Sequence, residues 1–76
     1  MIVYVLVDKR NGGDEYIGVY GTKERANEIL NNFRIIWTQY ETRMYHDVVI
    51  PEDVLKAKVD FDVSFYEIIE DELDGS

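Results

Sequence analysis

The first twenty residues contain two apolar segments separated by a polar turn. Residues 2–7 are rich in β-branched and aromatic side chains and are apolar at every position, which is typical of a central strand covered on both faces. Residues 11–13, Asn-Gly-Gly, supply the positive φ angles that a hairpin reversal needs. In residues 15–20, Ile17 and Val19 share one face of a second strand. The pattern therefore predicts a β-hairpin.

A long stretch without Gly or Pro runs from Thr22 to the residue before Pro51, and its apolar side chains recur every three or four residues. Thr22 is a suitable N-cap, so the spacing predicts one helix from about residue 23 to about residue 45. A second interpretation ends the helix at residues 31–32, Asn-Asn, and makes residues 34–40 a strand. We favour the long helix, because two Asn cost only about a few tenths of a kcal/mol each. The stripe comprises Ala26, Leu30, Phe33, Trp37, Tyr40 and Met44, flanked by Ile29 and Ile36.

The last third of the chain predicts a helical turn followed by a strand. Pro51 suits the first position of a single turn. Residues 57–65 then alternate strictly between apolar and polar side chains, which predicts a strand with one buried face. The alternation slips between Phe65 and Tyr66, where we expect a bulge or a tight turn. Residues 71–76 are expected to form a frayed acidic tail.

These elements predict a single α+β domain that spans residues 1–76. Its sheet would be small and mostly antiparallel, with three or four strands packed against one long helix in the order β-β-α-β. A chain of 76 residues has room for one hydrophobic core and no more. The absence of Cys excludes disulfides and the usual zinc sites, so the stability margin is expected to be small.

Three segments resemble a group of small, uncharacterised bacterial and phage proteins with a β-β-α-β plan. The first two are Val3-Tyr-Val-Leu6 and Ile17-Gly-Val-Tyr-Gly-Thr22-Lys-Glu-Arg-Ala26, which are similar to the hairpin and helix start of that group. The third is Phe65-Tyr-Glu-Ile-Ile-Glu70, similar to its last aromatic strand. The resemblance covers roughly residues 2–30 and 61–72 and implies a fold without an activity. Residues 34–56 form a long insert relative to the group.

The net charge of −8 is concentrated at the C-terminal end. Residues 59–76 carry seven carboxylates and no Lys or Arg, whereas residues 1–58 carry the other nine acidic side chains and all eight basic ones. A block of one sign favours basic partners and repels nucleic acid and anionic membranes. The seven are Asp60, Asp62, Glu67, Glu70, Asp71, Glu72 and Asp74. We expect Asp60 and Asp62 to be held on a strand and residues 70–74 to be loose.

No pattern in the chain indicates an enzyme, a cofactor or a metal centre. The pair His46 and Asp47 lacks a nucleophile or second base placed by spacing. Asp60, Asp62 and Ser64 lack the wrapping turn of a hard-cation site, and residues 11–13 open a strand where a phosphate loop would open a helix. The apolar run at residues 2–7 is too short for a membrane span or a signal peptide. We therefore expect a cytoplasmic, non-enzymatic protein that binds neither nucleic acid nor membrane directly.

These features favour an acidic binding protein whose partner is a protein with a basic surface. The hypothesis is a phage or mobile-element inhibitor of a host nucleic-acid-binding defence protein, acting through its negative surface and mimicking nucleic acid. The seven carboxylates would supply the charge, and Trp37, Tyr40 and Met44 an apolar anchor. Whether the C-terminal strand or a second chain covers these three stays open. The alternative is an assembly module that forms a homodimer through the helix stripe, with the acids serving solubility only.

Overall fold

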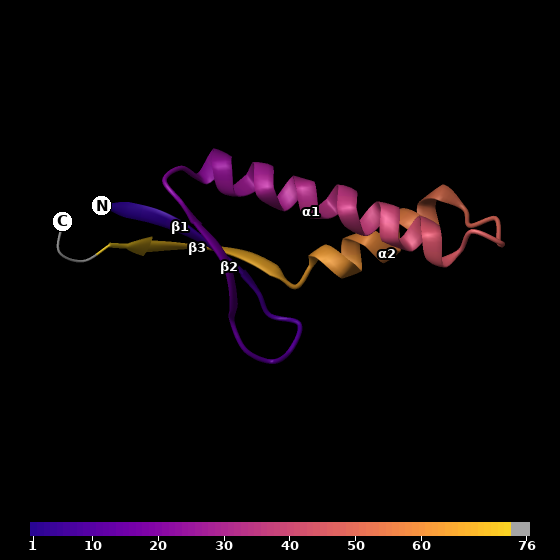
Figure 1. The fold of residues 1–76 in the computed structure, drawn as a ribbon, viewed down its shortest axis with the longest axis horizontal. Helices are drawn as coiled ribbons and strands as arrows, with labels where there is room; N and C mark the ends of the chain where they lie inside the picture. The colour runs from indigo at the N-terminus through magenta and orange to yellow at the C-terminus, as the bar shows by residue number, and fades with distance from the viewer. Residues whose placement is uncertain (74–76) are drawn as a thin grey trace.

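The computed structural model describes residues 1–73, and this part of the chain forms one antiparallel sheet and two helices (Figure 1). The elements are β1 (Ile2–Asp8), β2 (Glu15–Tyr20), α1 (Lys23–Met44), α2 (Glu52–Val63) and β3 (Tyr66–Glu72). The strand order is β2-β1-β3. The α+β class is therefore confirmed, and β1 is the central strand that its uninterrupted apolar run predicted.

The β1–β2 hairpin forms where the sequence predicts it. Gly12 takes the positive φ of 81° that the reversal requires, and its backbone N–H donates to the carbonyl oxygen of Lys9 at 3.3 Å. The register shifts by one residue between Leu6 and Val7, which marks a β-bulge on the β2 side. Gly18 leaves room for the Tyr20 ring, because a Cβ at Gly18 would lie 2.5 Å from the Tyr20 hydroxyl.

Helix α1 is continuous over 22 residues, which confirms the long helix over the interpretation that ended it at residues 31–32. The Thr22 hydroxyl accepts a hydrogen bond from the backbone N–H of Arg25 at 3.2 Å, as predicted for an N-cap. The helix lies on one face of the sheet (Figure 1). On that face the Tyr66 ring stacks on Phe33 with centroids 4.9 Å apart. Tyr66 stands opposite Asp8 in β1, so these two side chains share a face of the sheet. Leu6 lies two residues before Asp8 and therefore projects to that face as well.

Residues 57–65 do not form the predicted strand: residues 52–63 are α2, and Ser64 and Phe65 form the turn into β3. Pro51 is the N-cap of a twelve-residue helix and does not open a single turn. The alternating pattern was ambiguous, because Leu55, Val59 and Val63 are also spaced by four. Burial of Val59 against α1 selected the helical period, and two acidic residues in the first turn favour it electrostatically. The predicted break before Tyr66 is confirmed.

The end of the chain is more ordered than expected up to residue 72. Asp71 and Glu72, placed by the sequence in a frayed tail, are the last residues of β3 and stand opposite Val3 and Ile2. Pairing with β1 holds these two residues in place, because the backbone groups on the second side of β1 form their hydrogen bonds with β3. Residues 74–76, which include Asp74, lie outside the described part of the chain.

The molecule is elongated, with extents of 54 × 25 × 16 Å. Its radius of gyration is 15.1 Å, whereas a compact chain of this length would have about 11.4 Å. The reason is the length of α1, about 33 Å, against about 23 Å for the seven-residue β1. The second half of α1 therefore extends beyond the sheet, where α2 packs along it (Figure 1). We call this helical hairpin, residues 34–63, the arm.

Candidate protein-binding surfaces

The structure separates the predicted acidic residues into two groups. Asp60 and Asp62 lie on α2, so the expectation that they project from a strand is wrong. Four others lie on β3, and Asp74 is outside the described residues. The predicted contrast between rigid and loose carboxylates is therefore wrong, because a helix holds Asp60 and Asp62 and the sheet holds those on β3. We call the β3 group, which consists of Glu67, Glu70, Asp71 and Glu72, the acidic edge.

The two predicted acidic residues on α2 make contacts within the fold and do not face a partner freely. Asp60 accepts a hydrogen bond from Nη1 of Arg34 on α1, with the two atoms 2.6 Å apart. Asp62 is half-buried, and its backbone carbonyl accepts a hydrogen bond from Nη2 of Arg10 at 2.8 Å. The Asp60 side chain thus joins α2 to α1, and the Asp62 backbone carbonyl joins α2 to the hairpin. They do not extend a ladder of negative charge.

The acidic edge follows β3, whose outer side pairs with no other strand among residues 1–73. Its side chains point to both faces of the sheet. Glu67 and Asp71 stand opposite Val7 and Val3 and point to one face. Glu70 and Glu72 stand opposite the intervening residues of β1 and point to the other face. All four carboxylates are exposed. The strand thus combines open backbone groups with negative charge on each of its faces.

The interactions of the acidic edge leave most of its charge uncompensated. Lys9 Nζ lies 2.6 Å from Glu67 Oε2, and this hydrogen bond raises the pKa of Lys9. Glu70 accepts a hydrogen bond from the Tyr4 hydroxyl at 3.4 Å. Asp71 accepts one from the backbone N–H that follows it. Among residues 1–73, Glu67 alone of the four has a cationic partner.

The three residues predicted as an apolar anchor have different environments. Trp37 is half-buried and donates from Nε1 to the Tyr66 hydroxyl at 3.0 Å, so the start of β3 in the same chain covers it. Tyr40 contacts Trp37 edge to face, with centroids 5.3 Å apart, and is exposed. Met44 is also exposed. The sequence left open whether the C-terminal strand of the same chain or a second chain covers these three residues. In the structure, the same chain covers only Trp37 of the three.

Arg10 lies at the centre of a cluster of contacts that the sequence did not indicate. Its guanidinium carbon lies 4.5 Å from the centroid of the Trp37 ring and 5.3 Å from those of Phe65 and Tyr66. Its Nε lies 3.1 Å from both carboxylate oxygens of Asp8. These partners come from β1, α1, the turn before β3 and β3 itself, and these segments are far apart in sequence. In the sequence, the nearest indication of this cluster was the pair of aromatic residues Phe65 and Tyr66 at the predicted break in the alternating pattern.

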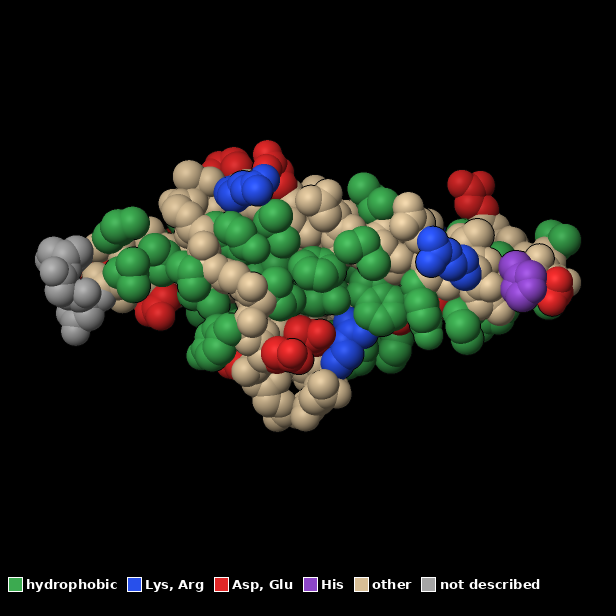
Figure 2. All heavy atoms as spheres, in the orientation of Figure 1, with side chains coloured by type: hydrophobic (Ala, Val, Ile, Leu, Met, Phe, Trp, Pro, Cys, Tyr) green, Lys and Arg blue, Asp and Glu red, His purple; other side chains and the backbone are tan. Residues whose placement is uncertain are grey.

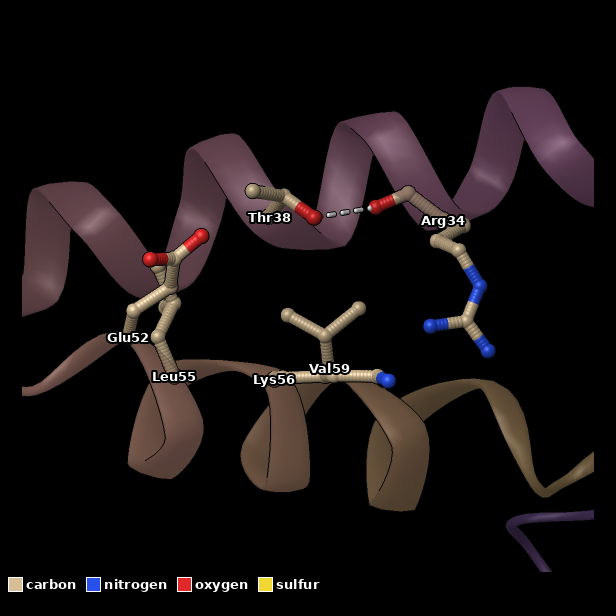
Figure 3. A pocket seen from close by; sticks show the side chains of 6 residues that line it. All are labelled: Arg34, Thr38, Glu52, Leu55, Lys56 and Val59. Carbon is tan, nitrogen blue, oxygen red and sulfur yellow. Dashed lines mark hydrogen bonds between the residues drawn. The ribbon is translucent and has the colours of Figure 1, made fainter.

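Two shallow cavities lie between the helices of the arm. One, of about 230 Å³, is shown in Figure 3, where Val59 points from α2 toward α1 and Thr38 donates a hydrogen bond to the Arg34 carbonyl. Glu52, Leu55 and Lys56 complete its lining, so cationic and acidic groups are mixed around an apolar floor. The volume is below the range of about 300–1,000 Å³ that is usual for small-molecule sites. This cavity therefore does not indicate a ligand.

The other cavity, of about 390 Å³, places two carboxylates side by side. Glu41 of α1 and Asp62 of α2 both line it, together with Lys58 and Phe61. Burial raises the pKa of Glu41 above its ordinary value of 4.5, and the neighbouring Asp62 carboxyl raises it further. The Tyr45 hydroxyl, as a hydrogen-bond partner, raises the pKa of Lys58. Glu41 is therefore the acid of this cavity whose ionisation is disfavoured.

We expect Glu41→Gln to make the protein more stable than the wild type at neutral pH. A raised folded-state pKa means that the Glu41 contribution to stability is present at acid pH and is lost as pH rises through the folded-state value. The advantage of the variant should therefore vanish on acidification, as followed by urea unfolding across a pH series. Asp62→Asn should reproduce only part of the gain, because burial of Glu41, the largest cause of its raised pKa, would remain, and the double variant should gain less than the sum. Parallel pH profiles for the variant and the wild type would contradict this account.

Further candidate chemistry is sparse in the described part of the chain. Nε2 of His46 lies 3.1 Å from Oδ2 of Asp47, but both side chains are exposed at the end of α1 and face no nucleophile. Within residues 1–73 no three His, Cys, Asp or Glu side chains converge as metal ligands would. Neither helix there is long and apolar enough to cross a membrane.

No protein-family model, curated protein or solved structure matches this chain.

Proposed function

We propose that this protein is a non-enzymatic binding module whose acidic edge engages a basic surface on a partner protein. One observation carries the proposal: β3 is an edge strand with exposed carboxylates on both faces, and three of the four have no cationic partner among residues 1–73. Natural edge strands are usually shielded, and an open one is a template for another chain.

The physical basis is strand addition combined with charge. An extended segment that pairs with β3 would gain main-chain hydrogen bonds, while its alternate side chains would meet carboxylates on each face. Opposite charges across a strand pair contribute about 0.2–1 kcal/mol each. The net charge of −8 also accelerates encounter with a basic surface, and salt weakens that effect.

The row of carboxylates along the acidic edge supports nucleic-acid mimicry as the form of recognition. Residues 70–72 are three consecutive acids, and the two that share a face, Glu70 and Glu72, are about 6.6 Å apart along the strand. A nucleic-acid backbone likewise presents negative charge at regular intervals. We therefore propose a nucleic-acid-binding protein as the partner. Small size, acidity and the resemblance to phage proteins favour an inhibitor of a host defence protein.

The test is a charge reversal with a matched control. Glu70→Lys, Asp71→Lys and Glu72→Lys together should weaken binding to the partner at least about tenfold and flatten its salt dependence. Reversal of Glu15, Asp47 and Asp53 changes the net charge equally at sites away from β3, and should change affinity much less. Binding partners are captured from host lysate at low and high salt, then purified for titration in the presence and absence of duplex DNA.

The titration decides between the outcomes. Mimicry requires that DNA compete with the protein for its partner. A partner bound equally well by the wild type and the β3 triple variant would overturn the proposal. An equal loss in the control triple variant would also overturn it, because net charge alone would then explain binding.

A further inference from the structure

Helix α1 carries an apolar stripe that neither the sheet nor α2 covers. At about 100° per residue, Ile29, Ile36 and Tyr40 fall within about 40° of one another around the helix axis. Ile36 is 55% exposed, Tyr40 is exposed and Ile29 is half-buried. We call these three residues the apolar flank. Figure 2 shows hydrophobic side chains gathered along the molecule between α1 and the sheet.

The exposed area of the chain exceeds that of a compact monomer of the same mass. The accessible surface is 5641 Å², whereas a compact monomer of 9.0 kDa would expose about 4,850 Å². The excess of about 800 Å² equals the share that one protein contributes to an interface of standard size. Much of this excess arises because the arm extends beyond the sheet. An interface along α1 would remove it.

We propose that the apolar flank binds the same flank of a second copy, with the two α1 helices antiparallel and Ile36 at the two-fold axis. Such an interface is isologous, so every contact occurs twice. A self-complementary surface needs opposite charges at matching distances on either side of the axis. Helix α1 meets this condition.

The charges beside the apolar flank select a second copy in the antiparallel orientation. Glu28 lies eight residues before Ile36 and Arg43 lies seven residues after it, which places them about 12 Å and about 10.5 Å from the axis. Glu28 of each copy would therefore meet Arg43 of the other. A parallel pair would bring like charges together at both positions, which is unfavourable.

The existing ion pairs are compatible with this arrangement. Glu28 already contacts Arg25, with Oε2 and Nη1 2.8 Å apart, and Arg43 of the second copy would extend that pair into a network. No ion pair is found for Arg43 within residues 1–73. Arg43 is exposed and close to the apolar flank around the helix. Its charge is thus available to a neighbouring molecule.

Dimerisation would place two acidic edges on one particle. A partner with two basic sites would then bind the second edge at a raised effective concentration. This consequence rests on the proposed function, whereas the interface itself does not. The two are separable, because the residues of the acidic edge and of the apolar flank belong to different elements.

The test uses two adjacent isoleucines with nearly equal exposure. Ile36→Glu would place two carboxylates at the two-fold axis, so light scattering after gel filtration should give the monomer mass of 9.0 kDa where the wild type gives twice that mass. Ile35 is 56% exposed but points about 100° away around the helix. Ile35→Glu should therefore stay dimeric. Thermal unfolding of both variants verifies that they are folded.

A charge swap tests the orientation. Arg43→Glu should weaken the dimer by about twofold to fivefold, because Glu28 of each copy would then meet Glu. Adding Glu28→Arg should restore wild-type association only if the helices are antiparallel. A wild-type monomer at every concentration would overturn the proposal, as would identical behaviour of Ile35→Glu and Ile36→Glu. The triple variant of the acidic edge should remain dimeric, which keeps this test independent of the proposed function.

Discussion

Leu6→Ala is expected to lower the free energy of unfolding by about 3 kcal/mol, the largest effect of any substitution considered for this protein. Leu6 is 0% exposed and belongs to the central strand, on the face where α1 lies. A truncated side chain would leave a cavity between sheet and helix. Because a domain of this size has only about 3–5 kcal/mol in total, most of its stability would be lost.

Urea unfolding followed by circular dichroism measures this effect. Val19→Ala on β2 is the matched control, because it removes apolar carbon from the same sheet at an exposed position. The control should cost about 0.5 kcal/mol or less. Equal midpoints for the two variants would show that burial of Leu6 under α1 contributes little to stability.

Arg10→Ala should have the second largest effect, a loss of about 2–3 kcal/mol. The variant removes the guanidinium that lies on the Trp37 ring and donates to the Asp62 carbonyl. It also leaves Asp8, whose side chain is 15% exposed, without its cation. A charged group that loses its partner in a partly buried position is destabilising. The Trp37 fluorescence should shift as well, since its nearest charge is gone.

Two controls separate the contributions of Arg10. Arg10→Lys keeps the positive charge but loses the planar group and its fork of donors, so an intermediate loss is expected. Arg25→Ala removes an exposed arginine with one ion pair on α1 and should cost about 0.5 kcal/mol or less. A loss in Arg10→Ala as small as that in Arg25→Ala would show that the aromatic contacts contribute little.

Arg10 also explains how a small core supports a long arm. Six apolar residues are buried among residues 1–73, and all but Val59 belong to the sheet or to the first turn of α1. The arm is joined to the sheet through Arg10, Trp37 and Tyr66, where cation–π and hydrogen-bond contacts meet. The arm therefore needs no second chain at its base. Farther along α1, the apolar flank is where we propose that a second copy binds.

The two proposals assign different tasks to different parts of the chain. The acidic edge on β3 would meet a basic partner, and the apolar flank of α1 would hold two copies together. Neither depends on the carboxylates of α2, because Asp60 pairs with Arg34 and the Asp62 carboxyl lies beside Glu41. The seven predicted acids are thus not one surface. Those on β3 keep the predicted role as a proposal.

Elements with strong local signals were predictable from the chain. The hairpin follows from the Asn-Gly-Gly turn between apolar strands, and the start of α1 follows from the cap at Thr22. The length of α1 follows from its repeated spacing of three and four. In each case the deciding interactions lie within a few residues of one another, so the pattern alone was sufficient.

The segment at residues 57–65 shows where such signals fail. Its apolar positions fit a strand with period two, and a subset fits a helix with spacing four. The choice depended on a surface far away in sequence, the side of α1 against which Val59 is buried. For the same reason the cluster around Arg10 was not foreseeable, since Arg10 and Tyr66 are 56 residues apart in the sequence.

Local patterning and composition were enough to establish the α+β class, the central place of β1, the continuous α1 and the excess of negative charge. Contacts between distant segments settled the rest: which carboxylates stand on an open strand edge, that Trp37 is covered by Tyr66, and that the apolar flank stays exposed. The physical reason is that β-turns, helix caps and hydrophobic periodicity depend on residues that are close together in the sequence. Burial and charge pairing depend on which surfaces the folded backbone brings together.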